Sequence, residues 1–270
     1  MRKQFWISLV ILLSLCLWGS YENKALEMNA FPVNCHALPE AFDGFVIAQI
    51  SDLHNAQFGE NNRDLLRLLS DTKPDLIVIT GDLVDSRHTD EDSAVAFAKE
   101  VSSVAPCYYV TGNHEAWLSH HSTLETRLTE AGITVLRNSA LSLDRDGQSI
   151  VLAGVDDPAF LGEARFLQKL EDLSPENFCI LLSHRPEYFD YYCQAGFDLV
   201  LSGHAHGGQF RIPFLGGLVA PGQGFFPEYD GGIYTSGTTT MAVSRGLGNS
   251  ILPIRLNNPP EILLITLVRQ

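Results

Sequence analysis

Residues 45–54 read F-V-I-A-Q-I-S-D-L-H, an apolar run that stops at a polar turn. Short runs rich in β-branched residues are typical of strands that are buried on both faces. Runs of this kind recur along the chain, at 45–50, 75–80, 107–111, 149–155, 178–183 and 197–203. Segments with helical character lie between them, at 61–72, 90–103, 119–131, 162–172 and 186–194. This alternation predicts an α/β fold with a largely parallel sheet.

The sequence pattern changes after residue 204. Between 208 and 268, glycines separate short β-like pieces and the helical pattern is lost. The run E-I-L-L-I-T-L at 261–267 ends this segment and has the character of a strand. We therefore expect β-hairpins and long loops here, closed by one strand, within the same domain.

Polar residues follow the apolar runs at their carboxyl ends. The five turns read I-S-D-L-H (50–54), T-G-D-L-V-D (80–85), T-G-N-H-E (111–115), S-H-R (183–185) and S-G-H-A-H-G-G-Q (202–209). In open α/β sheets, ligands bind beyond the carboxyl ends of the strands, so the turns can converge on one site. Their Asp, His and Asn side chains suit zinc, manganese, iron or nickel better than magnesium or calcium.

The spacing within the turns supports a metal site. Asp52 and His54 lie two residues apart and can reach one ion if the backbone curls, and His204 and His206 repeat that spacing. Three glycines flank the second pair and permit backbone conformations that a Cβ forbids: Gly203, Gly207 and Gly208. Asp82 can bridge two ions with its two oxygens. Each turn alone has ordinary structural explanations, but the ordered set favours a shared site.

This ordered set of motifs resembles the calcineurin-like metallophosphoesterase superfamily over residues 45–268. The later motifs resemble its bacterial YkuE-like branch: G-G-Q-F-R-I-P-F-L-G-G-L (207–218), V-S-R-G-L-G-N-S (243–250), P-I-R (253–255) and P-P-E-I (259–262). The resemblance implies a four-layer αββα sandwich with the site at the strand ends.

The resemblance also implies two divalent transition-metal ions, whether manganese, zinc, iron or nickel. One ion would be held by Asp52, His54, Asp82 and His206, and the other by Asp82, Asn113, His184 and His204. A hydroxide bridging the ions would attack phosphorus, with His114 as the general acid. Glu115 stands where many relatives have Asp. Because neutral His114 could not donate the proton, we expect Glu115 and Asp85 to raise its pKa.

The motifs specify the reaction more closely than the substrate. The branch implies a phosphodiesterase or pyrophosphatase, acting on small or lipid-linked substrates such as UDP-2,3-diacylglucosamine. A phosphomonoesterase acting on small molecules or phosphoproteins stays open, as does a non-catalytic metal-binding scaffold at the membrane or cell wall. The apolar residues after His206 are either a core patch or a wall for a lipid or nucleotide base: Phe210, Phe214, Leu215, Phe225 and Phe226.

Residues 1–20 place Arg2 and Lys3 before an apolar run that extends from Phe5 to Trp18. This order is typical of a secretory signal or signal-anchor, and it predicts a membrane-anchored or secreted protein on the extracytoplasmic face. Whether the segment is cleaved stays open, and a buried or amphipathic helix is the alternative. We interpret residues 21–44 as a linker, with room for an initial strand or hairpin.

The composition limits the partners. With 18 Lys and Arg against 32 Asp and Glu, the net charge of −14 argues against binding to long nucleic acids. The five cysteines are an odd number without C-x-x-C spacing, so no disulfide framework is expected, although a Cys179–Cys193 bond stays open. Four histidines fall outside the motifs and are expected on the surface or in loops, with His88 and His120 near enough to the turns to line a cleft: His36, His88, His120 and His121.

Overall fold

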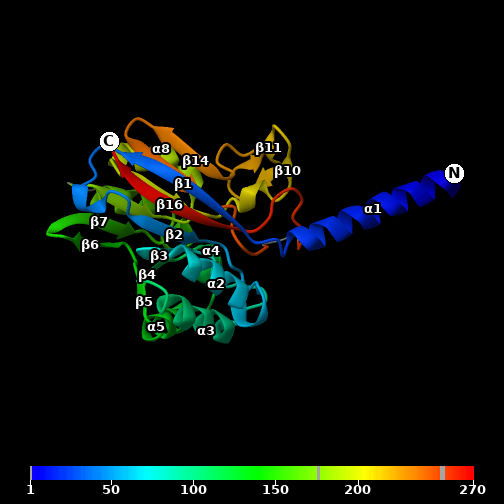
Figure 1. The fold of residues 1–270 in the computed structure, drawn as a ribbon, viewed down its shortest axis with the longest axis horizontal. Coiled ribbons are helices and arrows are strands. Elements are labelled where there is room, and N and C mark those ends of the chain that lie inside the picture. The colour runs from blue at the N-terminus through cyan, green and yellow to red at the C-terminus, as the bar shows by residue number, and fades with distance from the viewer. Residues whose placement is uncertain (1, 175–176, 250–252) are drawn as a thin grey trace.

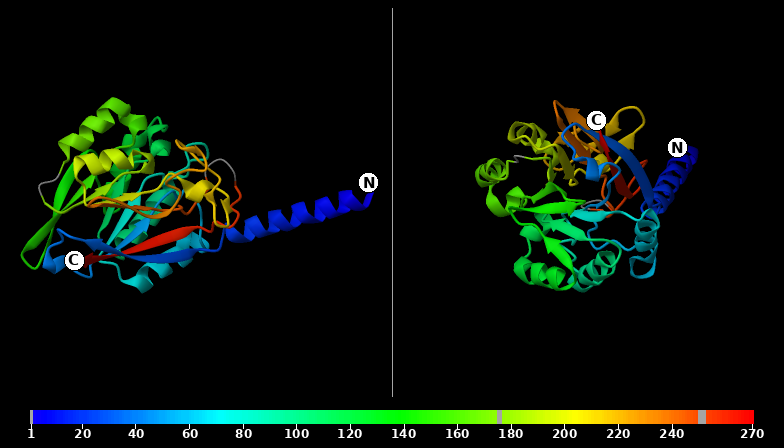
Figure 2. Two further views of the ribbon diagram at one scale, coloured as in Figure 1. Left: turned by 90° about the horizontal axis from the view of Figure 1, so that it is seen from above. Right: turned by 60° about the vertical axis from the view of Figure 1, so that its left-hand side comes forward.

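The computed structural model describes residues 2–174, 177–249 and 253–270. Two six-stranded sheets pack against each other, and helices cover their outer faces (Figure 1). One long helix at the N-terminus, α1 (Arg2–Glu22), extends away from this body (Figure 1 and the left view of Figure 2).

The first sheet has the strand order β1-β16-β2-β3-β4-β5. Its strands are β1 (Glu27–Cys35), β16 (Glu261–Arg269), β2 (Val46–Ile50), β3 (Leu76–Thr80), β4 (Cys107–Val110) and β5 (Ile133–Val135). The strands β2, β3, β4 and β5 run parallel, whereas β16 runs antiparallel to β2 and parallel to β1. All five residues of β3 are buried, as its uninterrupted apolar sequence predicts.

The second sheet has the strand order β14-β15-β9-β8-β7-β6. Its strands are β14 (Gly232–Ser236), β15 (Thr239–Val243), β9 (Leu199–Ser202), β8 (Cys179–Leu182), β7 (Gln148–Gly154) and β6 (Ser139–Arg145). The four central strands are parallel, and an antiparallel partner lies at each edge.

Three apolar clusters fill the spaces between four layers. The middle cluster lies between the sheets, where Ile47 and Val78 of the first meet Ile180 and Leu201 of the second. The outer clusters join the first sheet to α2 (Arg63–Thr72), α3 (Glu91–Ser102) and α5 (His121–Glu130), and the second to α7 (Glu163–Asp172) and α8 (Phe189–Ala195). The layering is therefore αββα.

The αββα layering that the resemblance implies is confirmed, whereas the expectation of largely parallel pairing is confirmed only in part. The chain builds two sheets, and each contains antiparallel pairs. The apolar runs have the same local pattern in both sheets, because inner strands such as β3, β8 and β9 are buried on both faces. Sheet membership depends instead on pairing between distant residues, as in β16 with β2.

The stretch 21–44, interpreted as a linker, contributes more than a connection. Its strand β1 pairs with β16 over nine residues, from Glu27 opposite Glu261 to Cys35 opposite Arg269. Backbone hydrogen bonding along that length makes β1 an integral edge of the first sheet. Within the described ranges, no helix combines the length and the apolar character that crossing a membrane requires. The extracytoplasmic location stays a prediction.

The segment after residue 208 forms short hairpins, as expected: β10 (Arg211–Ile212) with β11 (Gly216–Gly217), and β12 (Val219–Ala220) with β13 (Gly224–Phe225). The core-patch interpretation of its aromatic residues is wrong, because Phe214, Leu215, Phe225 and Phe226 are exposed. A Cys179–Cys193 bond is not formed, since both residues are free thiols.

Candidate metal centre

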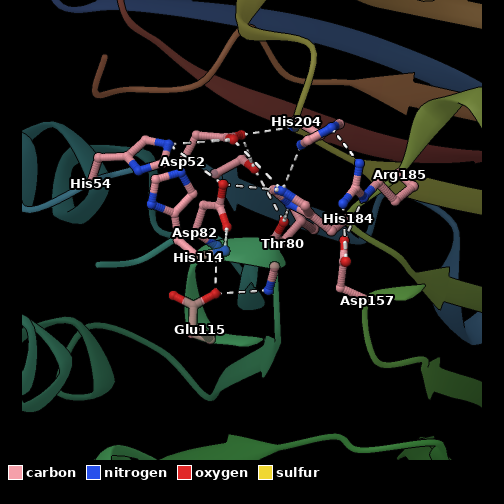
Figure 3. Close-up of polar contacts among 12 residues, drawn as sticks. Asp52, His54, Thr80, Asp82, His114, Glu115, Asp157, His184, Arg185 and His204 are labelled. Carbon is pink, nitrogen blue, oxygen red and sulfur yellow. Dashed lines mark hydrogen bonds and ion pairs between the residues drawn. The ribbon is translucent and has the colours of Figure 1, made fainter. Parts of the chain in front are cut away.

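Five strand ends from the two sheets supply the predicted site. The turns after β2, β3 and β4 carry its residues from the first sheet, and the turns after β8 and β9 carry those from the second (Figure 3). Two hydrogen bonds hold the sheets together at this point, from Gln49 Nε2 to the Ser202 carbonyl at 2.8 Å and between His184 Nδ1 and the Thr80 carbonyl at 2.7 Å. The metal-binding turns therefore meet where the sheets are tied.

The backbone of these turns curls as the two-residue spacing requires. Asp52, His54, Asp82, His204 and His206 all have φ values between 47° and 65°. This left-handed region is unfavourable for residues with a Cβ, and such strain is concentrated at functional sites. A Cβ at Gly203 would collide with Ser51 Oγ, so glycine is required there for the turns to approach each other.

One group of side chains contains Asp52, His54, Asp82 and His206, whose ligand atoms all lie within 4.8 Å of one another. The Nε2 atoms of His54 and His206 are 3.3 Å apart, and His206 Nε2 is 3.4 Å from Asp52 Oδ1. The other oxygen of Asp52 accepts hydrogen bonds from Ser51 Oγ and the His204 backbone N–H. Asp52 is thus oriented with one oxygen directed at the two imidazoles.

A second group contains Asp82, His184 and His204, again with ligand atoms within 4.8 Å. His184 Nε2 lies 3.1 Å from His204 Nδ1 and 3.3 Å from Asp82 Oδ2. The same oxygen of Asp82 is 3.6 Å from His54 Nε2, whereas Oδ1 accepts the His114 backbone N–H at 2.8 Å. Asp82 therefore faces both groups through Oδ2 alone, where two oxygens were expected.

The donor set fits divalent transition metals. Asp52 Oδ1 and Asn113 Oδ1 are buried and have no hydrogen-bond partner among the described residues. Buried oxygens without a partner are costly, and a coordinated cation offsets that cost. Mixed imidazole and carboxylate donors suit zinc, manganese, iron or nickel. Asn113 borders the same cavity as Asp82 and His204, so all seven predicted ligands lie around one site.

Burial prepares most of the imidazoles for metal binding. It lowers the pKa of His54 to about 3, and it also lowers the pKa values of His204 and His206. Their neutral rings present the lone pairs that a metal requires. His184 differs: burial lowers its pKa, but the Asp82 carboxylate outweighs that effect and raises it to about 10. A cation at this position competes with the proton that His184 shares with Asp82.

His114 lies on the wall of the site and is held by the turn after β3. The Ser86 backbone N–H donates to His114 Nδ1 at 3.0 Å, which leaves the proton of the neutral ring on Nε2. Asp85 Oδ1 is 3.3 Å from the same Nδ1, so the carboxylate lies on the same side of the ring as the Ser86 N–H. Ligand atoms of His54, Asp85 and His114 also lie within 4.8 Å of one another.

The expectation that Glu115 acts on His114 is wrong. Its carboxylate instead accepts three backbone N–H groups, from Gly112 at 2.8 Å, Asp82 at 3.0 Å and Val84 at 3.2 Å. It is fully buried, and burial together with the Asp82 charge raises its pKa to about 7. Glu115 therefore joins the turns after β3 and β4 and fixes the position of Asp82.

One pair that the structure places at the site, Asp157 and Arg185, had no role predicted from the sequence. Arg185 donates to Asp157 from Nε at 2.5 Å and from Nη2 at 3.1 Å, and its Nη1 lies 2.6 Å from His204 Nε2 (Figure 3). Burial lowers the pKa of Arg185, but Asp157 outweighs this effect and keeps the guanidinium charged. Asp157 follows the end of β7, and this position at a strand end was the available signal.

The site opens into a cavity of about 360 Å³. It is lined by Asp82, Arg87, Asn113, His114, Trp117, Arg185, His204, His206 and Pro221. The Trp117 ring is exposed and lies 5.0 Å from the His114 ring between centroids. Two arginines and one exposed aromatic ring thus surround the side of the site that a substrate can enter.

Two histidine-rich groups that share a carboxylate at strand ends are the arrangement of a dinuclear metallohydrolase. The chain belongs to the calcineurin-like phosphoesterase family, whose model matches residues 45–208. It is therefore an enzyme of the metal-dependent phosphoesterase type.

Relatives agree with this assignment over most of the chain. The uncharacterized metallophosphoesterase YkuE of Bacillus subtilis is 33% identical, covering 91% of this chain and 87% of that protein. The phosphodiesterase YaeI of Escherichia coli is 31% identical, covering 83% and 82%. A dimetal phosphatase from Danio rerio shares the fold, with a TM-score of 0.50 and 15% identity over 76% of this chain and 88% of that one.

Proposed function

We propose that the chain hydrolyses phosphodiester and pyrophosphate bonds with two divalent transition-metal ions. The observation that carries this proposal is the position of Asp82 Oδ2, which faces both ligand groups beside one cavity. When bound, the ions supply Lewis acidity that activates a water and neutralises charge on the phosphoryl group. The name of the relative YaeI, a phosphodiesterase, supports diesters over monoesters.

His114 is the general acid in this proposal. Its Nε2 carries the proton to the leaving oxygen, while Ser86 and Asp85 hold the ring through Nδ1. In the charged ring, Nδ1–H faces Asp85 Oδ1, so the carboxylate stabilises the form that can give up a proton. Transfer leaves the neutral ring with its remaining proton on Nδ1, facing Asp85 Oδ1, and with a free lone pair on Nε2.

The test compares bis-p-nitrophenyl phosphate with p-nitrophenyl phosphate on protein loaded in turn with manganese, zinc, nickel or iron. We expect faster turnover of the diester. Preference for the monoester would replace the proposal with a phosphomonoesterase. Bound metal without turnover of either compound would indicate a metal-binding scaffold.

We propose lipid-linked phosphodiesters as the physiological substrates. The β12–β13 hairpin supports this, because it contributes Pro221 to the cavity while Phe225 beside it is exposed. UDP-2,3-diacylglucosamine should be hydrolysed with a higher kcat/KM than UDP-N-acetylglucosamine, which has the same pyrophosphate link but lacks the long acyl chains. Equal values for the two would contradict the lipid preference.

We also propose that the N-terminal segment directs the enzyme to the extracytoplasmic face of a membrane. Arg2 and Lys3 precede the apolar run, and Phe5, Trp6 and Leu17 of α1 are exposed. Protease treatment of intact cells should degrade the expressed full chain, and cell fractionation should find it with membranes or secreted. Protection from the protease until the cells are lysed would contradict this location.

A further inference from the structure

Arg185 is a cation placed at the edge of the metal centre. It lines the cavity together with Asp82, His114 and His204, and its side chain is 16% exposed. Guanidinium groups bind phosphoryl oxygens through directed N–H donors, and they do so most strongly where water is excluded. Arg185 is therefore positioned to bind an anion that enters the cavity.

Asp157 fixes the plane of this guanidinium. Its two oxygens accept Nε and Nη2, and its own Oδ1 also accepts the Ala159 backbone N–H at 2.8 Å. Asp157 is buried, so the pair has little freedom to reorient. The remaining donor nitrogen, Nη1, points from this pair toward His204.

The contact between Nη1 and His204 depends on where the imidazole proton lies. His204 turns Nδ1 toward His184 and Asp82, and Nε2 toward Arg185. A neutral imidazole that binds a cation through Nδ1 carries its proton on Nε2, and Arg185 can only donate. With a cation in that position, two N–H groups would face each other, and Nη1 would need another acceptor.

A group bound in the cavity can supply the hydrogen-bond acceptor that Arg185 Nη1 would then need. Glu187 Oε1 is 3.5 Å from Nη1, at the outer limit of a hydrogen bond. A phosphoryl oxygen beside the metal ligands would offer a closer, negatively charged acceptor to the same nitrogen.

We propose that Arg185 binds a non-bridging oxygen of the substrate phosphoryl group through Nη1, with Asp157 as its positioning residue. This inference rests on the proposed function for its substrate, but it concerns phosphate binding and not the chemical step. The alternative is that Arg185 only supports His204 as a metal ligand.

The test measures metal content and phosphate affinity separately. Wild type, Arg185→Met, Arg185→Lys and Asp157→Asn are loaded with manganese, their metal content is determined, and inorganic phosphate is titrated by calorimetry. We expect two ions per chain in all four, with phosphate affinity lowered about 10- to 100-fold in Arg185→Met and less in the other two. The value of kcat/KM for bis-p-nitrophenyl phosphate should fall in the same order.

Arg137→Met is the matched control. Arg137 forms a similar two-point pair with the neighbouring Asp156, at 2.9 and 3.0 Å, and it is not among the residues that line the cavity. Its phosphate affinity should stay within about twofold of wild type, the usual small effect of a distant change. This control distinguishes the effect of losing an arginine–aspartate pair from the effect of losing the phosphate contact.

Two results would overturn the proposal: wild-type phosphate affinity in Arg185→Met, or loss of a metal ion from that variant. If Arg185→Met fails to fold, Arg185→Lys and Asp157→Asn decide by the same criteria. Phosphate binding that depends on Arg185 in a protein without phosphoesterase turnover would refute the proposed function alone. Turnover with unchanged phosphate affinity in the variants would refute this inference alone.

Discussion

The two sheets contribute different chemistry to the metal centre. The first supplies the carboxylates Asp52 and Asp82, and the second supplies His184, His204 and His206. Both ligand carboxylates therefore come from one sheet, together with His54, while the other adds three imidazoles and the guanidinium of Arg185. Because neither half offers a complete ligand set for two ions, metal binding requires the sandwich to be assembled.

The largest effect is expected at Asp82, the residue that faces both groups. Asp82→Ala should lose both ions and reduce turnover to the metal-free level, because Oδ2 lies beside His54 and His184. Metal analysis and diesterase assays of the purified variant measure this. An Asp82→Ala protein that retains two ions would refute the sharing of this carboxylate.

Removal of one imidazole from each of the two ligand groups should distinguish the two metal ions. His206→Ala should weaken the ion held with Asp52, and His204→Ala the ion held with His184, by at least about 100-fold each, the upper value for changes that only support a ligand. Calorimetric manganese titrations should then show one tight site per variant. Equal loss of both ions from both variants would mean that the groups act as one site.

His114→Ala should retain both ions and lower turnover about 10²- to 10⁴-fold, the usual contribution of a general acid. The structure supports this because Nδ1 is held by the Ser86 N–H and Asp85. His36→Ala, an exposed residue just past β1, is the control and should behave as wild type. Loss of metal from His114→Ala would make His114 a ligand instead.

The smallest effect is expected at Glu115, whose carboxylate joins the two turns that follow β3 and β4 in the first sheet. Glu115→Gln replaces one acceptor oxygen with an N–H₂ group that faces backbone N–H donors. We expect unfolding free energy to fall by roughly 1–3 kcal/mol, the cost of unsatisfied buried groups. Urea denaturation measures it, with exposed Glu130→Gln as control. An unchanged midpoint would show that Glu115 does not join the two turns.

The sequence identified much of this architecture because the relevant patterns are local. Buried strands such as β3 appear as apolar runs, and polar turns at their ends mark the ligands. The two-residue spacing of Asp52 and His54 already required a curled backbone, and both residues have left-handed φ values. Ligand residues that lie close together in the sequence could therefore be predicted from the sequence alone.

What escaped prediction depends on contacts between distant residues. The pairing of β1 with β16 has no local signature, and the division into two sheets was implied only by the family resemblance. The turn after β7 was overlooked because aspartate at a strand end resembles an ordinary helix cap, and Asp157 does cap a short helix at Ala159. The contact of Asp157 with its second partner, Arg185, becomes visible only when β7 and β8 pair within the second sheet.

The most direct test of a two-metal centre shared between the sheets is the number of ions that the wild-type chain binds. Metal-free protein would be titrated with manganese by calorimetry, and the metal-to-protein ratio determined after removal of free ions. The two ligand groups predict two ions per chain. A ratio of one at saturation, with full diesterase activity, would contradict the central claim.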